Sequence, residues 1–130
     1  MKQHILVVDD EKPVRELIEL YLRRHGYEVS VADSSAEALT LLDRQRVDLV
    51  VLDIGLADED GLQVLAELKT RHPNTRVVML TGMGFVEDLL EEAQRKGADG
   101  YVSKVLPLDE LALAIRRTLT PASAGETAQY

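Results

Sequence analysis

Short apolar runs alternate with segments of helical spacing along the chain, and this alternation limits the possible folds more than any other feature. The runs are rich in Val, Ile and Leu and are bounded by turn residues, which is typical of buried strands in a parallel sheet. They cover residues 5–8, 27–32, 47–53, 76–80 and 100–103. Parallel strands are joined by helical crossovers of one hand, so five such units fold into a doubly wound sandwich. The sequence therefore predicts an α/β fold with three αβα layers around a five-stranded parallel sheet.

The order of the strands follows from the same pattern. The run at 47–53 is the most apolar, so we expect it at the centre of the sheet. Five units of this kind predict the strand order 2-1-3-4-5, known as flavodoxin-like, with a crevice between the first and third strands.

Helical spacing and end signals place the five connecting helices. Pro13 suits a first helical turn, and Gly26 supplies the stop of that helix. Ser34 and Glu37 have the spacing of a capping box for the second helix, and Asp60-Gly61 opens the third. The apolar repeats of the first, fourth and fifth helices are Val14, Leu17, Ile18, Tyr21 and Leu22; Val86, Leu89, Leu90 and Ala93; and Leu108, Leu111, Ala112, Ile115 and Leu119.

Length and composition point to one domain. The chain has 130 residues, a formal net charge of −8 and no cysteine. We expect residues 1–119 to form the domain, and 120–130 to form a flexible tail or the start of a linker. The lack of cysteine excludes a disulfide framework and suits the cytoplasm, where we expect the protein. The negative charge disfavours direct binding to nucleic acid, and no apolar run approaches the roughly 20 residues that span a bilayer.

Polar residues end four of the apolar runs. These are Asp9-Asp10, Asp53, Thr81 and Lys104. The carboxyl ends of parallel strands share one edge of a sheet, so we expect these side chains to converge. Three neighbouring carboxylates stay ionised only beside a cation, and Mg²⁺ prefers such oxygen ligands. A carboxylate can also attack phosphorus, while a lysine and a hydroxyl serve the phosphoryl oxygens. The pattern therefore predicts a divalent-metal and phosphoryl site.

Each of these residues also has an ordinary interpretation. The two adjacent aspartates could cap a helix, Asp53 and Thr81 could be turn residues, and Lys104 could be solvated. Their coincidence at the ends of successive predicted strands favours a site. The acidic run at 58–60 is interpreted as a solvated loop with a helix cap. His4, His25 and His72 are interpreted as surface residues, because they share no ligand spacing.

Taken together, the motifs resemble the receiver domain of response regulators in two-component signalling. The resemblance covers residues 3–119 and is carried by Val-Val-Asp9-Asp10-Glu11, by Asp53 with Asp60-Gly61, by Leu-Thr81-Gly, and by Gly-Ala-Asp-Gly-Tyr101-Val-Ser-Lys104. It implies that Asp53 is the phosphoacceptor, that Asp10 and Asp53 bind Mg²⁺ directly, and that Asp9 acts mainly through water. The carbonyl of Gly55 would complete the protein ligands. Thr81 and Lys104 would contact the phosphoryl group, and Tyr101 would change rotamer on activation.

The chain departs from the family pattern at two positions. Val105 stands where the family usually has a proline, often after a cis bond, and Ala57 stands where the preceding loop usually has one. A cis bond before a residue other than proline costs about 3–4 kcal/mol, so we expect the Lys104–Val105 bond to be trans.

The resemblance also implies partners. A sensor histidine kinase or a phosphotransfer protein would supply the phosphoryl group. The face formed by residues 85–96 and 101–119 would bind a downstream partner or a second copy of the domain. The protein would catalyse its own phosphorylation and dephosphorylation, as a switch rather than a dedicated enzyme.

Three alternatives stay open at this point. The chain could be the N-terminal receiver of a longer regulator with a DNA-binding or enzymatic output domain. A flavodoxin-like cofactor protein would need a loop rich in Ser, Thr and Gly after the first strand, where this chain has Asp-Asp-Glu. A phosphatase of the haloacid dehalogenase type would need a second aspartate two residues beyond Asp53, where this chain has Gly55.

Overall fold

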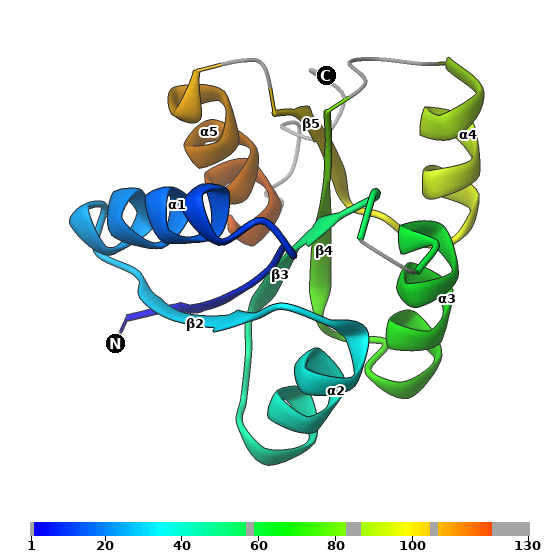
Figure 1. Cartoon of the computed structure of the whole chain (residues 1–130), viewed down its shortest axis with the longest axis horizontal. Coiled ribbons are helices and arrows are strands. Elements are labelled where there is room, and N and C mark those ends of the chain that lie inside the picture. Colours follow the sequence, from blue (N-terminus) through cyan, green and yellow to red (C-terminus); the bar gives the residue numbers. More distant parts are fainter. Residues whose placement is uncertain (1, 57–58, 83–86, 105–106, 121–130) are drawn as a thin grey trace.

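In the part of the chain that the structure describes, five strands alternate with five helices, as the sequence predicts (Figure 1). The computed structural model describes residues 2–56, 59–82, 87–104 and 107–120. The strands are β1 His4–Val8, β2 Glu28–Ala32, β3 Leu49–Asp53, β4 Arg76–Thr81 and β5 Gly100–Ser103. The helices are α1 Lys12–Arg24, α2 Ser35–Arg44, α3 Gly61–Arg71, α4 Glu87–Arg95 and α5 Leu108–Leu119.

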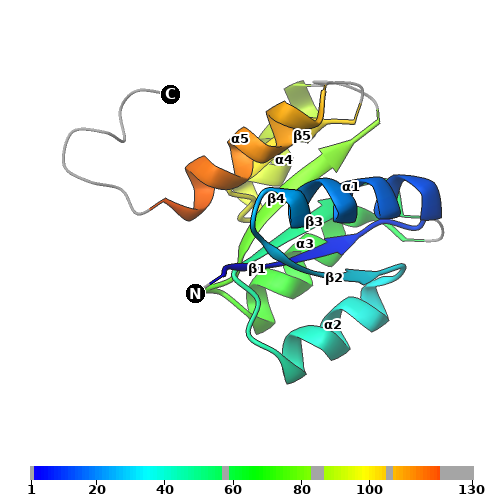
Figure 2. The same ribbon diagram turned by 90° about the vertical axis from the view of Figure 1, so that its left-hand side faces the viewer.

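The strands form one parallel sheet in the order β2-β1-β3-β4-β5. Helices lie on both of its faces (Figures 1 and 2), and a core layer of buried apolar side chains separates them from the sheet on each face. Helices α1 and α5 cover one face, and α2, α3 and α4 cover the other. The predicted α/β class, the three layers and the strand order are all confirmed.

The three interior strands, β1, β3 and β4, send apolar side chains into both core layers. In β1, Ile5 and Val7 enter the layer under α1 and α5, while Leu6 and Val8 enter the opposite layer. Successive side chains of a strand point to opposite faces, so a strand covered on both sides reads as a continuous apolar run. Strand β3 alternates in the same way, and all five of its residues are buried. This double burial explains why residues 5–8 and 49–52 form continuous apolar runs in the sequence.

The predicted end signals of the helices act as expected. The Ser34 side chain accepts a hydrogen bond from the Glu37 amide (3.3 Å), and the Asp60 side chain accepts one from the Leu62 amide (3.0 Å). Gly26 follows α1 with a φ of +90°, a left-handed conformation that favours glycine.

One member of the predicted apolar repeat of α1 does not face the core. Leu17 is 56% exposed, whereas Ile18 and Leu22 are buried. Helix α1 contacts both the sheet and α5. The buried stripe of α1 is narrower than the apolar repeat in its sequence.

Several predictions fall on residues outside the described ranges. They concern the Lys104–Val105 bond, Ala57, the start of the fourth helix at Val86, and the tail beyond residue 120.

Candidate active site

The register of the sheet brings the predicted site residues to one edge. Val8 pairs with Leu52, so Asp9 and Asp53 lie beside each other at the ends of β1 and β3. Leu80 pairs with Asp53, and Thr81 pairs with Ser103, which precedes Lys104. Asp9, Asp53 and Thr81 are all buried. Polar groups that the sequence separates by almost 100 residues therefore meet at the carboxyl ends of the strands.

The ammonium group of Lys104 is the centre of this cluster. Its Nζ lies 2.9 Å from Asp53 Oδ2, 3.0 Å from Asp9 Oδ2 and 3.0 Å from Glu11 Oε1. The sequence predicts the first two carboxylates as site residues, but not Glu11. Glu11 directly follows the two aspartates in the sequence, but the direction of a side chain in a strand-to-helix turn cannot be predicted from that position alone.

Backbone amides fix the orientation of the two buried carboxylates. Asp9 Oδ1 accepts a hydrogen bond from the Glu11 amide (2.9 Å), and Asp53 Oδ1 accepts one from the Gly55 amide (3.0 Å). These local bonds are the usual way in which an aspartate shapes a turn. In both residues the other oxygen, Oδ2, faces Lys104.

Burial and charge act in opposite directions on the titration of the site. Burial raises the pKa of Asp9 above its ordinary value, and the neighbouring charge of Asp53 adds to that effect, against hydrogen bonds from the Glu11 amide and Lys104. Burial alone would lower the pKa of Lys104. Its hydrogen bonds to Asp53, Glu11 and Asp9 outweigh burial and raise that pKa above the ordinary lysine value. The lysine is therefore a permanent cation. Burial makes the charged form of the Asp9 carboxylate less favourable than it would be in water.

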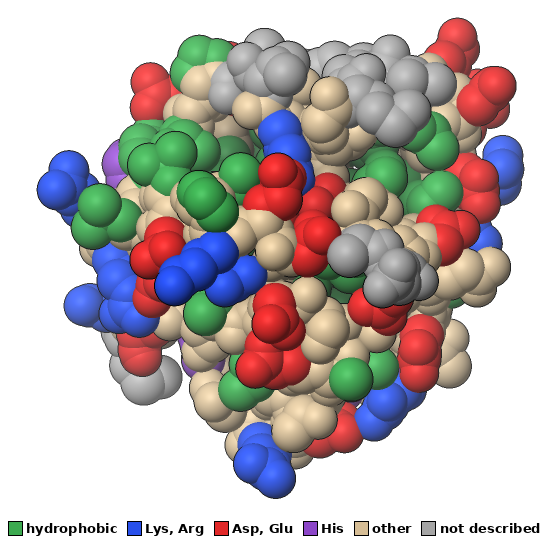
Figure 3. Space-filling model, in the orientation of Figure 1, with side chains coloured by type: hydrophobic (Ala, Val, Ile, Leu, Met, Phe, Trp, Pro, Cys, Tyr) green, Lys and Arg blue, Asp and Glu red, His purple; other side chains and the backbone are tan. Residues whose placement is uncertain are grey.

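The carboxylates fit a metal ion. Asp9, Asp10 and Asp53 each offer an oxygen, and these oxygens lie within 4.8 Å of one another. Lys104 contributes one positive charge against these three carboxylates and that of Glu11, so negative charge is in excess. Acidic side chains also gather near the centre of the face shown in Figure 3. Hard oxygen donors with excess negative charge are the ligand set of a divalent cation.

The remaining predicted residues lie around this cluster. Thr81 is 1% exposed at the end of β4, and its carbonyl accepts a hydrogen bond from the Lys104 amide (2.6 Å). Gly55 is exposed in the turn that follows β3. Tyr101, on β5, is partly buried against the core layer that contains Met79 and Ala93.

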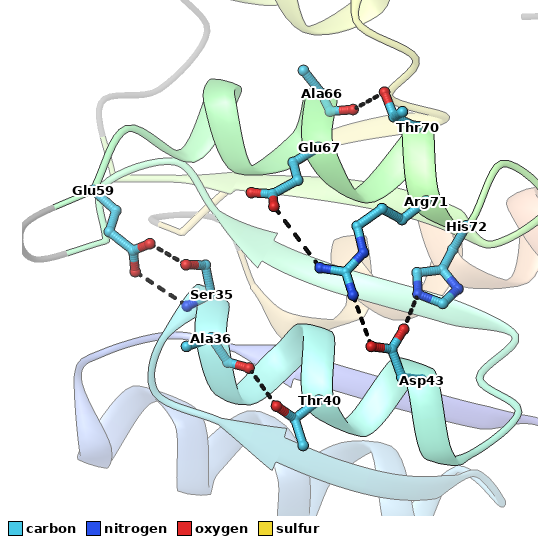
Figure 4. Close-up of polar contacts among 10 residues, drawn as sticks. All are labelled: Ser35, Ala36, Thr40, Asp43, Glu59, Ala66, Glu67, Thr70, Arg71 and His72. Carbon is cyan, nitrogen blue, oxygen red and sulfur yellow. Dashed lines mark hydrogen bonds and ion pairs between the residues drawn. The ribbon is translucent and has the colours of Figure 1, made fainter.

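The loop after β3 is tied to α2 by a contact that the sequence analysis missed. The Glu59 carboxylate accepts hydrogen bonds from the Ser35 amide (3.1 Å) and from the Ser35 hydroxyl (Figure 4). The interpretation of this acidic run as merely solvated is wrong for Glu59, whereas Asp60 is the helix cap that was predicted. The loop that carries Asp53 is therefore anchored at its far end.

Two of the three histidines are also less exposed than predicted. The Nε2 atom of His72 lies 3.0 Å from Asp43 Oδ1, on the same surface between α2 and α3 (Figure 4). The Nε2 atom of His4 lies 2.7 Å from the Ser30 hydroxyl. Both side chains are partly buried, while His25 is exposed.

Comparison with known proteins adds to this geometry. A family model described as "Response regulator receiver domain" matches residues 5–116. The chain belongs to this family. The receiver domain is 37% identical over 115 residues to the probable transcriptional regulatory protein TcrX of Mycobacterium tuberculosis, covering 88% of this chain and 49% of that protein. It is 31% identical over 119 residues to the sporulation initiation phosphotransferase F of Bacillus subtilis, covering 92% of this chain and 95% of that protein.

Solved structures show the same fold. A CheY-like receiver domain protein from Methanospirillum hungatei superposes with a TM-score of 0.85 at 27% identity, covering 92% of this chain and 94% of that one. The receiver domain spans only 25–49% of the length of several regulators that it matches, among them the transcriptional regulatory protein GlrR of Escherichia coli. Within the described residues, none of the helices has the length and apolar character needed to cross a membrane.

Proposed function

We propose that this receiver domain accepts a phosphoryl group on Asp53 in a reaction that depends on Mg²⁺. The observation that carries the proposal is the position of Lys104, whose Nζ lies 2.9 Å from the Asp53 carboxylate beside the acidic cluster. A buried carboxylate with a cation at one side and metal ligands at the other is suited to attack phosphorus. Neither a solvated lysine nor a helix-capping aspartate accounts for that arrangement.

Each residue of the site has a role in this reaction. An Asp53 oxygen forms a bond to phosphorus while the bond between phosphorus and the donor's histidine nitrogen breaks, and the electron pair leaves with that nitrogen. Lys104 and the hydroxyl of Thr81 stabilise the negative charge on the phosphoryl oxygens. Asp10 and Asp53 would hold Mg²⁺ directly, with Asp9 acting mainly through water and the Gly55 carbonyl as a further ligand. When bound, the ion neutralises charge on the transferring group.

The phosphoryl donor in this proposal is a sensor histidine kinase or a phosphotransfer protein. The printed name of the B. subtilis relative is that of a phosphotransferase, which supports transfer chemistry at this site. The lack of a membrane-crossing helix in the described residues fits a cytoplasmic location.

The output of the switch is a second part of the proposal. Several of the regulators that the domain matches are transcriptional regulatory proteins of greater length, which supports a receiver that controls an output domain. Thr81 would move towards the new phosphoryl group, and Tyr101 would turn into the space beside β4. The described parts of α4, β5 and α5 would then present an altered face to a downstream partner or a second copy of the domain.

The experiment is phosphorylation of the purified domain by acetyl phosphate, with and without Mg²⁺, followed by intact-protein mass spectrometry. We expect the mass of one phosphoryl group to be added in the presence of Mg²⁺, and none to be added to Asp53→Asn. Asp33→Asn is the matched control, because Asp33 is an exposed aspartate that follows β2 at the same edge of the sheet. Equal labelling of Asp53→Asn and wild type would contradict the proposal.

A further inference from the structure

The contact between Glu11 and Lys104 joins two parts of the site that are 93 residues apart in the sequence. Glu11 is the N-cap residue of α1, yet its side chain makes no capping hydrogen bond to that helix. Its backbone is fixed from two sides, because its amide binds Asp9 Oδ1 and its carbonyl accepts a bond from the Arg15 amide (2.9 Å). The carboxylate is thus directed across the crevice to Lys104.

Three carboxylate oxygens surround the ammonium group of Lys104. An ammonium group has three N–H donors and no acceptor. Lys104 donates hydrogen bonds to Asp53 Oδ2 (2.9 Å) and Glu11 Oε1 (3.0 Å), and it forms an ion pair with Asp9 Oδ2 (3.0 Å). A phosphoryl oxygen would have to compete with these three carboxylates for the ammonium group.

The three partners of the lysine are not equivalent. Asp9 and Asp53 belong to the group of carboxylates that fits a metal ion, and Glu11 does not. Asp9 and Asp53 would turn their oxygens to a divalent cation bound there, and the charge of that cation would disfavour the nearby ammonium group. Glu11 is then the partner that remains with Lys104.

We propose that Glu11 is a positioning residue for Lys104, holding the ammonium group over Asp53 when a metal ion engages the other two carboxylates. This inference rests on the proposed phosphorylation of Asp53, and it adds a residue to that reaction. The Glu11 side chain is 59% exposed and that of Lys104 is 15% exposed. Solvent screens the charge of Glu11, so its main contribution is the geometry of the hydrogen bond.

The first test is the mobility of the lysine side chain, measured by NMR of ¹³C-lysine-labelled protein. The sequence contains five lysines, and Lys104→Arg identifies the signal of Lys104 by its loss. An immobilised lysine gives two resolved ε-CH₂ proton signals, whereas a freely rotating one gives an average. We expect two signals in metal-free wild type and in metal-free Glu11→Ala, because Asp9 and Asp53 suffice there. With saturating Mg²⁺ we expect two signals in wild type and one in Glu11→Ala.

The second test is the rate of phosphorylation by acetyl phosphate at saturating Mg²⁺. We expect Glu11→Ala to be about three- to tenfold slower than wild type, between the effects of an exposed ion pair and of a hydrogen bond to a charged group. Glu11→Gln keeps an acceptor oxygen without the charge, so it should recover at least half of the lost rate. Glu16→Ala is the control, since it removes an exposed acid from the same helix.

The outcomes separate this inference from the proposed function. Two Lys104 signals in Mg²⁺-loaded Glu11→Ala would overturn the positioning role, whatever the rate. A Glu11→Gln rate as low as that of Glu11→Ala would overturn it as well, since charge alone would then account for the effect. If the wild-type domain took up no phosphoryl group at all, the proposed function would fail, while the NMR result would still report the contact.

Discussion

Gly61, the first residue of α3, lies very close to the backbone that follows Asp53. A Cβ atom added at Gly61 would lie 2.5 Å from Ile54 Cα and Ile54 O, and 2.6 Å from Asp53 O. Carbon atoms in good contact are about 3.5–4.0 Å apart, so Gly61→Ala requires a shift of about 1 Å. All three neighbours are backbone atoms, so no side chain can turn aside to make room.

The cost of the substitution can be estimated from these contacts. Overpacking of a closed site costs about 1–3 kcal/mol. The shift also weakens the hydrogen bond from the Gly61 amide to the Ile54 carbonyl (2.9 Å), worth about 1 kcal/mol. The smaller conformational entropy of an unfolded chain with alanine offsets about 0.4–1 kcal/mol. We therefore expect Gly61→Ala to lower the free energy of unfolding by about 2 kcal/mol, and the melting temperature by about 8 °C.

The assay is thermal and urea unfolding followed by circular dichroism, together with the phosphorylation rate. Because Ile54 directly follows Asp53, the rate should fall along with stability. Gly55→Ala is the matched control, since its Cβ would meet only Asp53 Oδ1, at an ordinary 3.9 Å. We expect Gly55→Ala to unfold within about 0.5 kcal/mol of wild type. A Gly61→Ala protein that unfolds and is phosphorylated like wild type would refute the reasoning.

Two further predictions concern the core and the buried acid. Leu65→Ala should cost about 2–5 kcal/mol in urea unfolding, whereas Leu17→Ala should cost less than about 1 kcal/mol, because Leu65 is fully buried and Leu17 is 56% exposed. Equal losses would contradict the burial argument. Burial raises the pKa of Asp9, so the folded protein binds a proton at Asp9 more tightly than the unfolded chain does. The resulting stabilisation is complete below a pH of about 3.8 and is lost as the pH rises through the raised pKa. Metal-free Asp9→Asn should therefore be more stable than wild type at pH 7, with the difference vanishing below about pH 4. A variant less stable than wild type at pH 7 in urea unfolding would rule this out.

The parts of the structure that could be predicted from the sequence are those with a local signal. Asp9, Asp53, Thr81 and Lys104 each end an apolar run, and the shared edge of parallel strands brings such residues together. The helix cap at Asp60 has a signal of the same kind, a capping side chain directly before the helix.

The contacts that could not be predicted depend on long side chains and on neighbouring elements. Glu11 and Glu59 each reach a residue on a distant element, Lys104 and Ser35 respectively. Their directions depend on rotamers that the tertiary surroundings select. The exposure of Leu17 has a similar origin, because the width of a buried stripe depends on what covers the helix.

The double burial of the central strands has a consequence for their alignment. A strand with one solvent-exposed face is held in register by its alternation of apolar and polar residues, because a slip of one residue would expose its apolar side chains to water. Strands β1 and β3 lack that constraint, since both of their faces are apolar and either set of side chains suits either layer. A slip would instead draw the carboxylate of Asp53 in between the layers, away from Lys104, and leave a charge buried without a partner. The buried carboxylates of the site therefore oppose an inward slip of β1 and β3 and help to hold their observed register.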